Sequence, residues 1–152
     1  MAIEDKRIVY TLDEQVKIVI PSPKCSLTIE QLQSKKAIQK GVSTYVVDKE
    51  TIPNDRSFRN AWTFDGSKFG TNMTTAKEIH KNFIREARIQ KLKDLDIEFQ
   101  KALETSASTT DIIAKKKALR DAPADSAIDS ASTESDLKKQ WNSSILGSSP
   151  YS

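Results

Sequence analysis

The chain has 152 residues, of which 37% are hydrophobic and 30% are charged, so it is polar for a domain of this length. Its 24 lysines and arginines nearly balance 21 aspartates and glutamates and are interleaved with them, which argues against nucleic-acid binding. Because Cys25 is the single cysteine, an intramolecular disulfide and a thiolate zinc site are excluded.

The N-terminal sequence lacks the basic start and apolar stretch of a signal peptide. No apolar run approaches the ~20 residues that cross a bilayer as a helix. We therefore expect a protein without a membrane segment, synthesised in the cytoplasm.

The first part of the chain is predicted to be rich in β-structure. Two β-branched runs, Arg7–Leu12 and Val16–Ile20, flank a polar turn at 13–15 and predict a hairpin. A helix is expected from Thr28 to Lys40, followed by a third strand at Thr44–Val47.

The segment Ile52–Trp62 gathers a proline, an aspartate, two arginines and two large aromatic residues into eleven positions. Because Asn54 or Asp55 suits a helix N-cap, we predict two helical turns over residues 55–62. Phe58 and Trp62 would then stack at i, i+4, and Asp55 and Arg59 would pair at the same spacing.

This segment is the predicted partner-binding site, a docking wedge with one aromatic face and one arginine face. Arginine and tryptophan are enriched at binding hot spots. The predicted contact residues are Pro53, Asp55, Arg56, Phe58, Arg59 and Trp62. In the structural alternative, the two aromatic residues belong to the protein's own core and the arginines pair locally. Both interpretations can hold together.

After the wedge, Asp65-Gly66 between aromatic flanks predicts a tight hairpin. A helix of about 45 Å is expected from Thr75 to Glu104, with Thr75 and Glu78 at capping-box spacing. The predicted apolar stripe of this helix comprises Ile79, Phe83, Ala87, Leu92, Leu95, Phe99 and Ala102 or Leu103.

The remaining chain is predicted to complete a helical hairpin. Residues 105–109 break the long helix, and a second helix, Thr110–Arg120, returns antiparallel to it and ends before Pro123. A short helix is expected from Thr133 to Trp141. The predicted architecture is α+β, with a β-rich part at 1–72, a helical hairpin and short helix at 73–142, and a flexible tail at 143–152.

No residue pattern predicts catalysis, a metal site or a cofactor. His80, the single histidine, is expected to be a helix-face residue with no acidic partner at helical spacing. Asp94, Asp96 and Glu98 alternate by two, so a helix distributes them over different faces. No glycine-rich loop precedes a helix, so a phosphate-binding loop is not predicted. We expect that the protein is not an enzyme.

The run Lys115–Lys117 with Arg120 could contact a polyanion. Such a run is more often a solvated helix face, and its place near a helix C-terminus also complements the helix dipole.

The motif Ile52-Pro53-x-Asp55-Arg56-x-Phe58-Arg59-x-Ala61-Trp62 resembles the IPxDRxFRxAW signature of small proteins encoded by tailed bacteriophages. Further along, the segment 114–121 is similar to the KKxALRD of these proteins, and a related segment occurs in phage tail and tail-fibre assembly proteins. The resemblance covers about Tyr45 to Trp141. It implies a structural or assembly role in a phage particle.

Three functions follow as hypotheses. The leading one is a virion protein, an adaptor at the tail or its fibres that contacts other structural proteins of the tail, fibre or neck. It could also self-associate through the long helix. The alternative is an assembly chaperone that binds tail or fibre protein transiently and does not stay in the particle. The third is a DNA-associated regulator that uses Lys115–Lys117.

Overall fold

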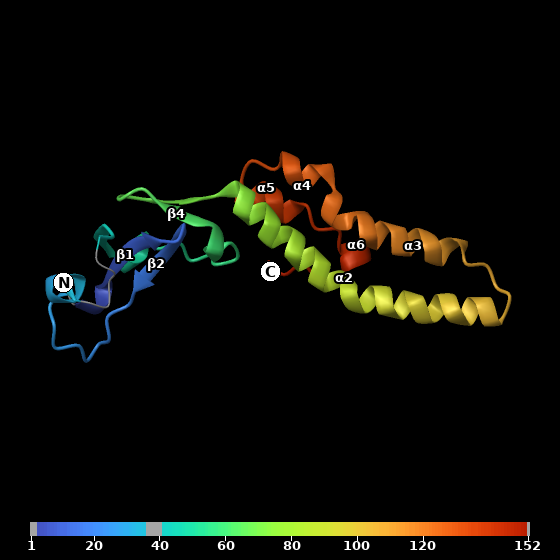
Figure 1. Cartoon of the computed structure of the whole chain (residues 1–152), viewed down its shortest axis with the longest axis horizontal. Coiled ribbons are helices and arrows are strands. Elements are labelled where there is room, and N and C mark those ends of the chain that lie inside the picture. Colours follow the sequence, from blue (N-terminus) through green and yellow to red (C-terminus); the bar gives the residue numbers. More distant parts are fainter. Residues whose placement is uncertain (1–2, 36–40, 152) are drawn as a thin grey trace. The chain divides into compact units, whose positions relative to one another are not determined.

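The computed structural model describes residues 3–35 and 41–151 and divides the chain into two compact units, 1–72 and 73–152. Among the described residues, every strand belongs to the first unit and the two longest helices belong to the second (Figure 1). The predicted α+β class is confirmed.

The elements of the first unit alternate short strands with single helical turns. In chain order they are η1 (Ile3–Asp5), β1 (Lys6–Leu12), β2 (Gln15–Val19), α1 (Ile29–Ser34), β3 (Thr44–Asp48), η2 (Lys49–Thr51), η3 (Arg59–Ala61), β4 (Trp62–Phe64) and β5 (Phe69–Thr71), where η denotes a 3₁₀ turn.

Strand β1 is the centre of an antiparallel three-stranded sheet with the order β2-β1-β3. The predicted hairpin is confirmed: Asp13 and Glu14 connect β1 to β2 with φ of 51° and 62°, as a two-residue turn with two positive φ angles requires. Val9 lies opposite both Ile18 and Tyr45, so these three side chains share one face of the sheet.

A small second sheet packs against this face. Strands β4 and β5 pair with each other, and the ring of Phe64 meets that of Tyr45 edge-on at a centroid distance of 5.5 Å. Ile8 and Val9 of the central strand are completely buried. The core of the first unit therefore lies around β1.

The predicted helix at 28–40 is shorter than expected. It is α1, which begins after Thr28 with a capping box in which Thr28 and Gln31 bond each other's backbone N–H groups. It ends at Ser34, because Lys35 is extended with ψ of 152°. Residues 36–40 of the prediction lie outside the described residues.

The second unit is helical. Its elements are α2 (Met73–Glu104), α3 (Thr110–Asp121), η4 (Ala122–Ala124), α4 (Ser126–Ser130), α5 (Glu134–Lys139) and α6 (Ser143–Leu146). The predicted return of α3 along α2 is confirmed (Figure 1). The predicted start of the long helix was wrong by two residues: Thr75 lies inside the first turn, so it is not the N-cap.

The buried face of α2 differs from the predicted stripe. It comprises Ala76, His80, Ile84, Leu95 and Ala102, whereas Ile79 and Phe83 are half-buried and Leu103 is exposed. The face is displaced because α5 and α6 also pack against α2. The spacing of apolar residues within α2 could not predict which of its residues α5 and α6 would bury.

The flexible tail predicted at 143–152 is corrected by the structure for residues 143–151, and Ser152 lies outside the described residues. Residues 143–146 form α6, whose N-cap Asn142 accepts a hydrogen bond from the Ser144 N–H at 3.1 Å. Leu146 is buried, and the indole of Trp141 donates to the carbonyl of Gly147 at 2.9 Å. Leu146 and, further along, Tyr151, which contacts His80, therefore attach this serine-rich stretch to the second unit.

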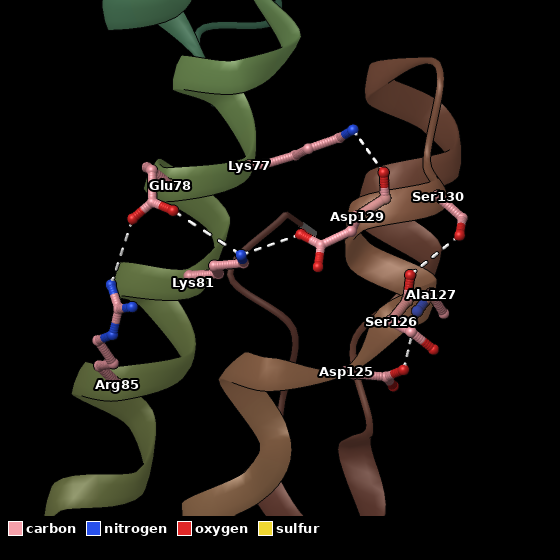
Figure 2. A network of polar contacts seen from close by, with 9 residues as sticks. All are labelled: Lys77, Glu78, Lys81, Arg85, Asp125, Ser126, Ala127, Asp129 and Ser130. Atoms are coloured by element: carbon pink, nitrogen blue, oxygen red, sulfur yellow. Dashed lines mark hydrogen bonds and ion pairs between the residues drawn. The ribbon is translucent and has the colours of Figure 1, made fainter.

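Short helix α4 is attached to the first turns of α2 by a polar network (Figure 2). Lys81 lies 3.0 Å from the carboxylate of Asp129, and Lys77 donates to the Asp129 backbone carbonyl at 2.7 Å. Glu78 bridges Lys81 and Arg85 at 3.8 and 3.7 Å. These polar contacts hold α4 beside α2, and the side chain of Ile128 in α4 is completely buried.

Candidate partner-binding surface

The segment Ile52–Trp62 does not form the predicted two-turn helix. Asp55 instead closes a turn, in which its Oδ1 accepts from the N–H and the hydroxyl of Ser57 at 3.0 and 2.7 Å. Only Arg59–Ala61 is helical, as the 3₁₀ turn η3, and Trp62 begins strand β4. The i, i+4 geometry expected for Phe58 with Trp62, and for Asp55 with Arg59, is therefore not formed.

The two aromatic residues of the segment are core residues of the first unit. Phe58 is 1% exposed and Trp62 is 4% exposed, and the indole meets the ring of Phe69 edge-on at 5.6 Å. Burial of such a side chain contributes about 2–3 kcal/mol. The structure thus agrees with the structural alternative for Phe58 and Trp62, and their direct contact with a partner stays a prediction.

The polar residues of the segment face outward. Asp55, Arg56 and Arg59 are exposed and Pro53 is half-buried. Neither Arg56 nor Arg59 has an ion-pair partner within the described ranges. The segment therefore keeps its predicted arginine face without the predicted helix, and buried aromatic side chains on both sides of Arg59 hold the backbone that carries it.

Pro53, Arg56 and Arg59 line a small cavity of about 110 Å³ together with residues from the sheet. We call it the basic pocket; its members are Arg7, Ile18, Ile20, Lys49, Ile52, Pro53, Asn54, Arg56 and Arg59. Four of these side chains are cationic and none is acidic, whereas Ile18, Ile20 and Ile52 supply apolar surface. The pocket thus combines positive charge with an aliphatic lining.

One of the four cations is neutralised locally. Lys49 forms an ion pair with Asp5, and the ammonium group lowers the pKa of that carboxyl. Arg7 donates to the backbone carbonyls of Glu4 and Lys6 at 2.6 and 2.8 Å, and these bonds fix the guanidinium without cancelling its charge. The basic pocket therefore retains the charges of Arg56 and Arg59, whereas the Asp5 carboxylate also attracts the guanidinium of Arg7.

The sequence predicted the arginines of the segment but not the sheet residues beside them. Arg7 shares a face with Val9 by the alternation of β1, and Ile18 lies opposite Val9. The alternation of Ile18 with Ile20 was visible in the sequence. The sequence did not predict that residues 49–59 pack beside the face of the sheet that carries Val9 and Ile18.

In the second unit, His80 is buried and joins three segments. Tyr151 lies with its hydroxyl 2.5 Å from Nδ1 and its ring stacked on the imidazole, and the carbonyl of Gln140 lies 3.0 Å from Nε2. Burial lowers the pKa of this histidine, against an opposing effect of the Gln140 carbonyl. With both ring nitrogens engaged, His80 has the geometry of a structural residue.

A larger cavity of about 700 Å³ lies in the second unit, beside Ile84, Trp141 and Leu146. The two carboxylates that line this cavity already form contacts with other residues of the second unit. Asp121 pairs with Lys117, and Asp125 accepts from the Ala127 N–H at 3.0 Å as the N-cap of α4. This arrangement does not favour a charged ligand there.

The lysine run of α3 is partly engaged as well. Lys116 lies 2.5 Å from the carboxylate of Asp96 and 5.1 Å from the ring centroid of Phe99, and Lys117 pairs with Asp121. Carboxylates therefore occupy two of the three ammonium groups proposed to meet a polyanion. The DNA-regulator hypothesis loses much of its support.

Self-association through the long helix stays a prediction. Ile89, Ile97 and Leu103 of α2 and Ile113 of α3 are each more than half exposed. They are separated by charged positions rather than joined in one continuous stripe.

Among residues 3–35 and 41–151, no three or more His, Cys, Asp or Glu side chains are grouped to hold a metal ion. In the same part of the chain, no helix is both long and apolar enough to span a bilayer. Comparison with known proteins finds no matching family model, no matching curated protein and no matching solved structure.

Proposed function

We propose that this chain is a structural component of a tailed-phage particle, an adaptor at the tail or tail fibre that acts by protein–protein contact. The observation that carries the proposal is the segment Ile52–Trp62. Its sequence resembles a motif of small phage proteins, and its Arg56 and Arg59 are exposed without ion-pair partners among the described residues.

The conformation of the segment supports a docking role. Phe58, Ala61 and Trp62 are buried, so the backbone that carries the arginines is fixed before any partner arrives. Preorganisation of this kind lowers the entropic cost of association. Arginine is also among the residue types that contribute most to binding energy in interfaces.

Quantitative mass spectrometry of gradient-purified particles of the phage that encodes this chain tests the proposal. Its peptides should be present at a fixed copy number relative to the major tail protein, in independent preparations. A replication protein of the same phage, absent from washed particles, is the control for contamination by the lysate.

The alternative, an assembly chaperone, gives a different result in the same measurement. The chain would be missing from purified particles but would co-purify with tail or fibre protein from infected cells. Fewer than one copy per particle would therefore overturn the structural role.

A further inference from the structure

We propose that the basic pocket binds an acidic segment of a partner protein, in which one aliphatic side chain is flanked by aspartate or glutamate residues. The inference rests on the proposed function, since it names the chemistry of the partner at the same surface. It is argued from the charge, the apolar lining and the size of the pocket.

The charge of the pocket favours an anionic partner. Its lining has four cationic side chains and no acidic one; Lys49 forms an ion pair with Asp5, whose carboxylate also attracts Arg7. Two of the remaining cations, Arg56 and Arg59, are exposed and have no ion pair among the described residues. A guanidinium group can bind a carboxylate through two parallel hydrogen bonds, which gives both strength and orientation.

The apolar lining favours an aliphatic anchor between the acids. Ile20 is 61% exposed, while Ile52 is 9% exposed and forms buried surface beside it. An aliphatic side chain placed here would cover Ile20 and stabilise the complex by removing apolar surface from water.

The size of the pocket argues for a peptide side chain rather than a small-molecule ligand. Its volume of about 110 Å³ is well below that of small-molecule pockets, which hold roughly 300–1,000 Å³. A peptide can place one side chain in the cavity while its acidic neighbours reach the cations at the edge.

A nucleic acid fits this site less well. Proteins that bind single strands combine a basic groove with aromatic faces on which bases stack. The two aromatic residues nearest the arginines in sequence, Phe58 and Trp62, are buried. The surface between the cations is instead formed by isoleucines and a proline.

The test is a peptide array that covers the tail and fibre proteins of the same phage, probed with the full-length chain. We expect binding to peptides with an aliphatic residue among acids. For the strongest peptide, measured by fluorescence polarisation, the double variant R56Q/R59Q should weaken binding at least tenfold. The variant I20A should weaken it severalfold.

The matched control is K24Q/K68Q, which removes the same charge from exposed positions outside the pocket lining. It should change the affinity less than twofold. Circular dichroism should be the same for all variants, because none of the substituted side chains is buried.

The proposal is overturned if no peptide binds, if the bound peptides are neutral or basic, or if the control weakens binding as much as R56Q/R59Q. It is also overturned if a 20-nucleotide single strand binds tighter than the strongest peptide in an Arg56- and Arg59-dependent manner. Failure of the proposed function is seen separately: the chain would be absent from particles while its arginine-dependent peptide binding persisted.

Discussion

His80 connects the segment after α5 to the long helix through both of its ring nitrogens. The carbonyl of Gln140 can only accept, so Nε2 carries the proton and Nδ1 accepts from the hydroxyl of Tyr151. This pattern has a neutral imidazole; protonation of Nδ1 would turn that acceptor into a second donor, and the Tyr151 hydroxyl would have to accept instead of donate. Lys138, whose ammonium lies 5.5 Å from the Tyr151 ring centroid, adds positive charge nearby.

The second unit should therefore lose stability as the pH falls below about 6.5, the ordinary pKa of histidine. Burial lowers the pKa of His80 in the folded chain, so the unfolded chain binds the proton first. The contribution to stability is complete above the unfolded pKa and is lost as the pH falls through the folded one. Urea unfolding at pH 7.5 and 5.5, followed by Trp141 fluorescence in a Trp62→Phe chain, measures the difference.

The control for this prediction is His80→Gln. Since the chain has no other histidine, the variant removes the group that titrates in this range. Its unfolding free energy should be lower at pH 7.5 but should change less between the two pH values. An equal pH dependence in both proteins would show that other groups cause the loss.

At the scale of elements, the C-terminus of α2 contains a residue in a strained conformation. Ser106 has φ of 54°, and the Ala107 N–H bonds the carbonyl of Ala102 at 2.8 Å, as in a Schellman motif. Glycine adopts this conformation without the steric cost of a Cβ atom, so Ser106→Gly should stabilise the second unit by about 1 kcal/mol.

Thermal unfolding followed by circular dichroism measures this gain. Ser108→Gly, two residues further along, is the matched control: Ser108 does not have a positive φ, and its hydroxyl bonds Thr110. We expect the control to be neutral or destabilising. A gain of the same size at both positions would contradict the conformational explanation.

Gly66 in the β4–β5 turn tests the contact between the two sheets. Its φ is 99°, and a Cβ atom there would lie 3.1 Å from the ring of Tyr45. Gly66→Ala should cost the first unit about 1–2 kcal/mol from backbone strain, plus the displacement of that ring. Gly41→Ala shares the positive φ, and no atom of the described residues would lie within 4 Å of its Cβ, so it should cost less. Equal costs in chemical denaturation would show that the ring gives way freely.

The sequence predicted the elements that depend on local spacing and turn chemistry. The β1–β2 hairpin, the Asp65-Gly66 turn and the α2–α3 pair follow from such signals. The wedge was predicted as a helix because its caps favour one, but Trp62 pairs with Thr71 in the small sheet. Tertiary pairing overrode the local preference there, as it often does for short segments.

In the candidate site, too, the residues of one local motif were predicted and the residues that only the fold brings together were not. Arg56 and Arg59 were identified from their own motif, whereas Arg7 and Lys49 join them only through the folded sheet. His80 and Tyr151 are 71 residues apart, so no spacing rule could connect them.

At the scale of the whole molecule, each unit has its own buried side chains and its own tryptophan. Ile8 and Leu137 are both completely buried, the first in the unit of Trp62 and the second in the unit of Trp141. Truncation of a buried aliphatic side chain to alanine costs roughly 2–5 kcal/mol, much of it from the cavity left behind. Because two compact units need not unfold together, a single transition should not describe this chain.

We expect Ile8→Ala to lower the unfolding midpoint reported by Trp62, and Leu137→Ala to lower the one reported by Trp141. Each is followed by fluorescence in a chain with one tryptophan, Trp141→Phe for the first unit and Trp62→Phe for the second. If either substitution moved both midpoints equally, the two cores would be one cooperative unit. Separate midpoints would allow the basic pocket to be altered for binding studies while Trp141 reports an unchanged second unit.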